Sequence, residues 1–197
     1  MARTVDPRRV AQRREAITLA AARLFGTQGY QRTTVADIAR EAGLSPASVF
    51  YYFPDKAAVF RAIFARDLPL AEALVARHAE AEDPVAAILA IVAEQARDAA
   101  DPAAPGLLVE LLRRVEDDQE LAVVVTRTVE VLRAGLAALI ARGIAAGVID
   151  ARLDPAEAAA WLLSIVDACY LNAAPGRDPT GPLRRTVLAY LTPGGDV

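Results

Sequence analysis

The sequence has very few residues that bind metals or serve in acid–base catalysis: Cys169 is its single cysteine and His78 its single histidine. One cysteine cannot form an internal disulfide, and one cysteine with one histidine is too few for a structural zinc site, which takes four such ligands. The sequence therefore predicts no metal site built from these side chains and no cofactor.

Long apolar segments are also missing. The longest, residues 85–93, is far shorter than the roughly 20 residues that a helix needs to cross a bilayer. The first residues carry charges with no apolar stretch behind them, so no secretory signal is expected. Since 54% of the 197 residues are hydrophobic, the chain has enough of them for one large core or two small ones. We expect a folded, cytoplasmic protein with no membrane partner.

Charge is unevenly distributed along the chain. Residues 1–60 hold nine of the 22 Lys and Arg residues and five of the 25 acidic residues, a net charge of +4. The rest of the chain holds the other 13 basic and 20 acidic residues, a net charge of −7. A basic N-terminal segment on an acidic body suggests that only the first part meets a polyanion. A solvated basic helix would give the same pattern.

Helix-forming residues dominate the sequence, alternation of β-branched residues is rare, and proline and glycine recur at helical intervals. The sequence therefore predicts an all-α fold, with a helix-turn-helix domain over residues 1–54 and a larger helical domain over residues 55–197. We expect helices over about residues 8–27, 34–43, 45–53, 55–81 with a break at Pro69, 83–100, 106–116, 118–146, 154–172 and 182–191.

Two short helices joined by a glycine turn are predicted between residues 34 and 53. Thr34 is a good N-cap with Asp37 three residues later, and Gly43 ends this helix. Ser45 followed by Pro46 is a favoured start for the next helix. The two helices span about twenty residues, which is the size of a helix-turn-helix motif.

The second of these helices has two unlike faces. A helical wheel places Pro46, Val49, Phe50 and Phe53 toward the core and Ala47, Ser48, Tyr51 and Tyr52 on the exposed side. An exposed face of small and aromatic residues without charge suits a DNA groove, because Ser48 can reach a base edge and the tyrosyl hydroxyls can reach phosphates. The alternative is a helix packed on both faces.

Lys56, just after this helix, is the single lysine among 21 arginines. Its compact ammonium near the first turn of a helix is a sensible phosphate ligand. Arg13 and Arg14 continue the apolar stripe of the first helix toward its N-terminus, where they can touch the DNA backbone or simply be solvated.

Three spaced motifs in this region resemble the DNA-binding domain of the tetracycline-repressor (TetR) family. They are residues 17–30 (ITLAAARLFGTQGY), 33–45 (TTVADIAREAGLS) and 49–56 (VFYYFPDK), and the resemblance covers roughly residues 14–64. It implies a homodimeric, all-helical transcriptional regulator that binds double-stranded operator DNA, usually a repressor released by a small-molecule effector.

The resemblance also implies roles for single residues. Thr34 is implied to meet a phosphate as an N-cap, Ser45, Pro46, Ala47 and Ser48 to enter the groove, Tyr51 and Tyr52 to contact the backbone, and Lys56 to bind a phosphate. The sequence departs from the family at two positions, where Phe50 replaces a common tyrosine and Ala47 a common glycine. Both departures bear on which operator sequence is bound more than on whether DNA is bound.

The last two predicted helices resemble the dimerisation helices of this family. The sequence predicts an intersubunit four-helix bundle through apolar side chains of both helices. The residues expected there are Ala158, Leu162, Ile165, Cys169, Leu183, Val187 and Leu191. Ordinary packing within one chain is the alternative.

A largely apolar effector cavity is expected among the helices of residues 55–169. His78, Trp161 and Tyr170 are the candidate ligand contacts, because each combines an apolar body with a polar group. Residues of these types are more often ordinary core or surface residues than ligand contacts.

The alternatives to a DNA-binding regulator are an enzyme and an adaptor protein. An enzyme is disfavoured, since the sequence has no Gly-x-Ser-x-Gly, no Gly-x-Gly-x-x-Gly or Walker loop and no His-Glu-x-x-His. An adaptor that keeps the fold but no longer binds DNA is disfavoured by the intact exposed face of Ala47, Ser48, Tyr51 and Tyr52, together with Lys56.

Overall fold

The computed structural model describes residues 6–174 and 178–193, and within these residues all regular structure is helical. The elements are α1 (Pro7–Gln28), α2 (Val35–Glu41), α3 (Pro46–Tyr52), α4 (Lys56–Ala65), α5 (Asp67–His78), α6 (Pro84–Ala96), the 3₁₀ turn η1 (Arg97–Ala100), α7 (Ala104–Arg114), α8 (Gln119–Ala145), α9 (Pro155–Leu171) and α10 (Thr180–Leu191). The predicted all-α fold is confirmed. None of the helices in these residues is long and apolar enough to span a membrane.

The predicted helix ends in the N-terminal region are confirmed. Thr34 and Asp37 form a reciprocal capping box at the start of α2, and Ser45 caps α3 with Pro46 in its first turn. α1 ends at Gly29, whose φ of 87° lies in the region that favours glycine, and the turn after α2 contains Gly43 with a φ of 65°. These local signals set where α2 and α3 begin and where the turn between them lies.

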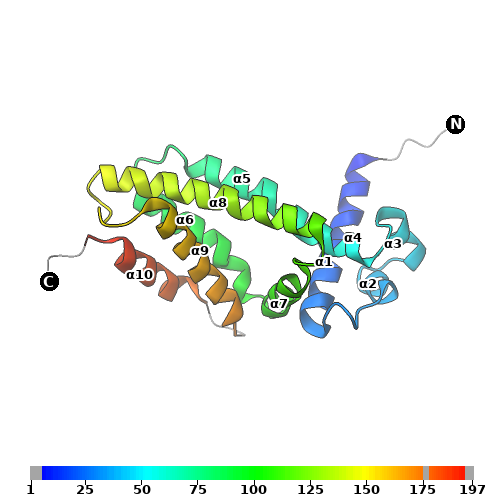
Figure 1. Cartoon of the computed structure of the whole chain (residues 1–197). Coiled ribbons are helices and arrows are strands. Elements are labelled where there is room, and N and C mark those ends of the chain that lie inside the picture. The colour runs from blue at the N-terminus through cyan, green and yellow to red at the C-terminus, as the bar shows by residue number, and fades with distance from the viewer. Residues whose placement is uncertain (1–5, 175–177, 194–197) are drawn as a thin grey trace.

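The molecule is elongated, with α1 to α4 at one end and α10 at the other (Figure 1). The helix-turn-helix end has its own core, which is built from α1, α2, α3 and α4 and closed by Leu121 of α8. Phe25, Tyr30 and Phe60 form an aromatic cluster at its centre, with ring centroids 5.1 to 5.4 Å apart. Because Val59, Phe60 and Ile63 of α4 are buried there, we propose that this domain extends beyond residue 54 to the end of α4.

The larger core lies among α5, α6, α8, α9 and α10. α8 is the longest helix, and α5 and α9 pack along it. Tight contact between α5 and α8 occurs at Gly135, where a Cβ would lie 2.5 Å from Cγ1 of Val75.

Two predicted helices differ from the structure. The expected helix over residues 55–81 is two helices, and the break is at Arg66 rather than Pro69. Pro69 lies in the first turn of α5, where a missing N–H costs no helical hydrogen bond, so it has no reason to break the helix. The helix expected over 83–100 ends as the 3₁₀ turn η1.

α1 and α7 cross with their backbones in contact, and this crossing joins the two ends of the molecule. A Cβ on Gly106 would lie 1.9 Å from the carbonyl oxygen of Gly26, and a Cβ on Gly26 would lie 2.1 Å from the carbonyl oxygen of Ala103. Only glycine fits such an approach. The orientation of the helix-turn-helix end therefore depends on two glycines far apart in the sequence.

Candidate nucleic-acid interface

Hydrogen bonds fix the start of α2 at Thr34. The Asp37 amide donates to Thr34 Oγ1 at 3.1 Å, and the Thr34 amide and hydroxyl donate to Asp37 Oδ2 at 3.0 and 2.6 Å. These bonds from Thr34 stabilise the charged carboxylate and hold the pKa of Asp37 below its ordinary value. Thr34 itself is exposed. It is therefore held in one conformation at the surface, as a residue that meets a phosphate should be.

α3 presents one narrow face to the core and the rest to solvent. Val49 is buried at 1% exposure, and Phe53, the residue directly after the helix, at 2%. Ala47 is exposed, and Tyr51 is 70% exposed. The ring of Tyr51 packs edge-on against that of Tyr52 at 5.0 Å. The exposed face predicted for this helix is confirmed for Ala47 and Tyr51.

Two residues that the helical wheel assigned to the core are exposed. Pro46 is exposed and Phe50 is 53% exposed, so that prediction was wrong for both. The reason is that α3 is short and packs mainly on α2, which covers little more than the strip through Val49. Phe50 therefore extends the uncharged exposed face that includes Ala47 and Tyr51.

The serines at the start of α3 are joined to each other. The Ser48 amide donates to Ser45 Oγ at 3.2 Å, and the two hydroxyl oxygens lie 2.9 Å apart. Ser45 is exposed and Ser48 is half-buried. A hydroxyl has one proton and two lone pairs, so Ser48 keeps hydrogen-bonding capacity beyond this contact.

Lys56 lies inside the fold rather than free at the surface. Its ammonium donates to the carbonyl oxygens of Tyr30 and Thr33 at 2.7 and 2.9 Å and lies 4.1 Å from the centre of the Tyr30 ring. Burial, together with the nearby Arg114 guanidinium, lowers the pKa of Lys56. We infer that Lys56 holds the loop between α1 and α2 against the start of α4, and its contact with a phosphate stays a prediction.

Replacing Lys56 with methionine is expected to lower the free energy of unfolding by about 1–2 kcal/mol, because two buried carbonyl oxygens lose a charged donor. Thermal unfolding measures this change, with Arg77→Met on the exposed side of α5 as the control. A purely surface phosphate ligand would leave the unfolding temperature unchanged and only weaken DNA binding, so an unchanged temperature would contradict the structural role.

Arg14 also serves the packing of α3. Its guanidinium donates to the carbonyl oxygen of Tyr52 at 2.6 Å and lies 4.1 Å above the ring of Phe53. Arg14 therefore supplies a hydrogen-bond donor to a carbonyl group at the C-terminal end of α3, where carbonyl groups lack partners within the helix and attract a cation.

The three predicted ligand contacts do not form a site. Trp161 is 54% exposed on α9, His78 lies in the last turn of α5, and the Tyr170 hydroxyl donates to the carbonyl oxygen of Gln95 at 2.6 Å. None of them lines any of the three cavities identified in the described residues. Trp161 is exposed because α9 turns this side chain away from the core that holds Leu162, and its contact with an effector stays a prediction.

Three carboxylates lie near Tyr170, of which Asp67 is half-buried and Asp98 and Asp167 are exposed. Burial raises the pKa of Tyr170 above its ordinary value, with Asp98, Asp67 and Asp167 adding to the effect. Burial likewise raises the pKa of Asp67 to about 6, although Arg66 opposes the shift.

The residues predicted for the dimer interface mostly belong to the core of the single chain. Five of them are almost fully buried within it, at 0 to 3% exposure: Ala158, Leu162, Leu183, Val187 and Leu191. In the single chain α9 packs against α6 and α8, and α10 packs against α6 and α9, which fits the alternative of ordinary packing within one chain. A dimer interface through these five residues stays a prediction. Ile165 and Cys169 are half-buried and line a hollow of about 200 Å³ between α9 and α10.

Sequence reasoning missed two features of the interface and its support. Phe50 was assigned to the core, and the Gly26 and Gly106 crossing was not recognised. Glycine inside a helix is unfavourable, so Gly26 within the pattern of α1 was a detectable signal of a close approach. Its partner at residue 106 lies in another helix and no local pattern links the two.

Comparison with known proteins supports the geometry of the N-terminal end. Residues 17–63 match the family model described as bacterial regulatory proteins, tetR family. Over 51 residues the chain is 49% identical to the HTH-type transcriptional regulator HbdR of Aromatoleum sp. (strain CIB). That match spans 26% of this chain and 22% of that protein, so the chain spans under a quarter of the curated relative it matches.

Solved structures extend the likeness to the whole fold. A TetR-family transcriptional regulator from Agrobacterium tumefaciens superposes with a TM-score of 0.76 at 23% identity, covering 93% of this chain and 99% of that one. A TetR transcription regulator from Haloarcula marismortui gives a TM-score of 0.74 at 25% identity, covering 92% and 97%. Residues 17–63 therefore carry the match to the tetR family of bacterial regulatory proteins, and the chain as a whole has the fold of these solved regulators.

Proposed function

We propose that this protein is a sequence-specific DNA-binding transcriptional regulator rather than an enzyme. The observation that carries the proposal is the exposed, uncharged face of α3 on a helix-turn-helix whose N-caps are fully formed. A helix with this face fits the major groove, where small residues let the backbone approach and side chains reach base edges.

The contacts divide by position on the motif. We propose that Thr34 and the tyrosines Tyr51 and Tyr52 contact the phosphate backbone and fix the register on the duplex. Residues 45–48 at the start of α3 then lie nearest the base edges, as the N-terminal end of a recognition helix does. Phe50 adds an apolar contact, for which the thymine methyl group is the natural partner in the major groove.

The function is tested by binding of the purified protein to the DNA upstream of its own gene. Fluorescence anisotropy at physiological salt with excess unrelated competitor DNA is the measurement. We expect competitor-resistant binding at nanomolar protein, in the range of specific regulators. Binding abolished by competitor, followed by failure to enrich any site from random DNA, would contradict the proposal and favour an adaptor.

We also propose that the protein acts as a homodimer through the outer face of α9. The buried residues of this helix are used within the chain, whereas Trp161 and Leu171, each 54% exposed, lie ten residues apart on its outer side. Helix-turn-helix proteins read two half-sites about one DNA turn apart, which requires two copies. An exposed tryptophan on a helix is a typical anchor of such an interface.

Trp161→Glu is expected to convert the dimer to a monomer, because it places two carboxylates in the centre of a symmetric apolar contact. Light scattering with size-exclusion chromatography measures the mass. Val123→Glu on the exposed side of α8 is the control and should leave the mass unchanged. A dimeric Trp161→Glu variant would place the interface elsewhere.

The family resemblance further implies repression relieved by a small-molecule effector. We propose the same for this chain, with release of operator DNA as the readout in the anisotropy assay.

A further inference from the structure

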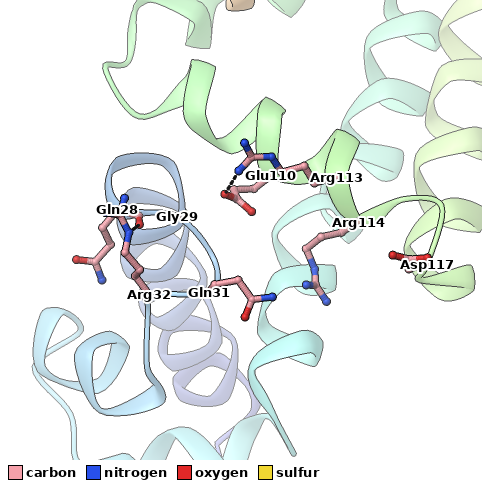
Figure 2. A pocket seen from close by; sticks show the side chains of 8 residues that line it. All are labelled: Gln28, Gly29, Gln31, Arg32, Glu110, Arg113, Arg114 and Asp117. Carbon is pink, nitrogen blue, oxygen red and sulfur yellow. Dashed lines mark hydrogen bonds and ion pairs between the residues drawn. The ribbon is translucent and has the colours of Figure 1, made fainter.

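A pocket of about 450 Å³ lies where the two ends of the molecule meet. One side is formed by the end of α1 and the loop after it, and the other by α7 and the turn that follows it (Figure 2). Its charged lining residues are Arg32, Glu110, Arg113, Arg114 and Asp117, and Gln28 and Gln31 add amide groups. The volume is in the range of pockets that bind small molecules.

Two of the three arginines already have partners. Arg113 forms an ion pair with Glu110 at 3.2 Å, and Arg32 Nε donates to the carbonyl oxygen of Gln28 at 2.6 Å. Arg114 differs from both, because its Nε is buried and has no hydrogen-bond partner among the described residues. A buried donor of a guanidinium that lacks a partner is costly, and such a group in a pocket calls for an acceptor.

Arg114 also faces a second cation. Its guanidinium stacks 3.6 Å from the centre of the Tyr30 ring, and the Lys56 ammonium lies 4.1 Å from the same centre. Nearby Arg61 is compensated by Asp118 at 3.0 Å and Glu120 at 3.1 Å. The Tyr30 side chain lies between Arg114 and Lys56 and carries no negative charge at neutral pH, so these two cations repel each other across it.

We propose that this pocket is a binding site for a small organic anion that carries a phosphate group, with Arg114 as its main ligand. A guanidinium matches phosphate oxygens with two parallel N–H donors, and a bound anion would both satisfy Arg114 and reduce its repulsion with Lys56. The glutamines suit the polar remainder of such a ligand. The binding proposal stands apart from the DNA-binding function, because it is tested by ligand binding alone.

The pocket has room for more than an inorganic ion. A second hollow of about 310 Å³ shares four lining residues with it and continues toward the apolar side chains of Phe25, Val109 and Leu171. The shared residues are Gly29, Arg32, Glu110 and Arg113. A ligand the size of a mononucleotide can therefore reach from Arg114 into the second hollow.

Isothermal titration calorimetry of the full chain with adenosine monophosphate, and separately with inorganic phosphate, tests the site. We expect one saturable site per chain for adenosine monophosphate. Arg114→Met keeps the aliphatic stem against Tyr30 but removes the charge, and it should weaken binding at least about tenfold. Glu110→Gln removes the carboxylate that competes for the arginines and should tighten binding, which separates loss of a ligand group from loss of folding.

Arg184→Met is the matched control, since Arg184 is exposed on α10 at the other end of the molecule (Figure 1). Its affinity should equal that of the unaltered chain. Inorganic phosphate binding as tightly as the nucleotide would support the site and identify free phosphate as its ligand. No saturable binding of either probe up to about 10 mM, or equal weakening by Arg114→Met and Arg184→Met, would overturn the proposal.

Discussion

An Ala47→Glu variant is expected to bind operator DNA at least about a hundredfold more weakly than the unaltered chain. Ala47 is exposed in the first turn of α3, where the backbone must approach the base edges most closely. A glutamate there adds bulk and a negative charge that the neighbouring phosphates repel. The measurement is the anisotropy assay with competitor DNA.

The same variant should keep its stability, because substitutions at exposed positions usually change the free energy of unfolding by under about 0.5 kcal/mol. Ala73→Glu, at an exposed position of α5, is the control for charge alone. If both variants bind DNA as the unaltered chain does, α3 is not the recognition helix. If both bind more weakly to the same extent, the loss comes from net charge and the face of α3 has no special role.

A Gly106→Ala variant is expected to be destabilised by about 3 kcal/mol, and the helix-turn-helix end should separate from the body in part of the molecules. The added Cβ would lie 1.9 Å from the Gly26 carbonyl oxygen, which is backbone and cannot rotate away. The α1–α7 crossing must open to accommodate it. Thermal unfolding measures the loss, and hydrogen exchange in α1 and α7 locates it.

Gly181→Ala is the matched control, because Gly181 also lies in the first turn of a helix but a Cβ there meets nothing within 4 Å. Alanine is the better helix former, so this variant should be as stable as the unaltered chain or slightly more stable. A Gly106→Ala variant of unchanged stability would show that α1 and α7 tolerate a wider separation.

The local elements of the DNA-binding end could be predicted from the sequence because their signals are short-range. Thr34 with Asp37, and Ser45 with Pro46, satisfy backbone groups only a few residues away, so the capping pattern alone fixes where α2 and α3 begin. The glycine turns and the apolar spacing complete the helix-turn-helix. The exposure of Ala47 and Tyr51 followed from the same spacing.

The sequence did not show which neighbour each helix face contacts, and only the tertiary structure shows this. Helical spacing shows that Leu162 and Val187 lie on the apolar faces of their helices. It does not show whether these faces pack against other helices of the same chain or against a second copy. For the same reason the helical wheel assigned Phe50 to the core, and the sequence did not show that Lys56 donates to two backbone carbonyl oxygens. The width of the covered strip on α3, and the carbonyl groups that face Lys56, depend on neighbours distant in sequence.

The sequence by itself determined the helical class, the helix-turn-helix and its exposed recognition face, because these follow from periodicity and from hydrogen bonds between close residues. Only the tertiary structure decided how the two ends of the molecule join at Gly26 and Gly106 and that Arg114 is left with an unpaired donor in a pocket. Both depend on backbones and charges that approach each other across some 80 residues of chain, and such approaches leave no local pattern.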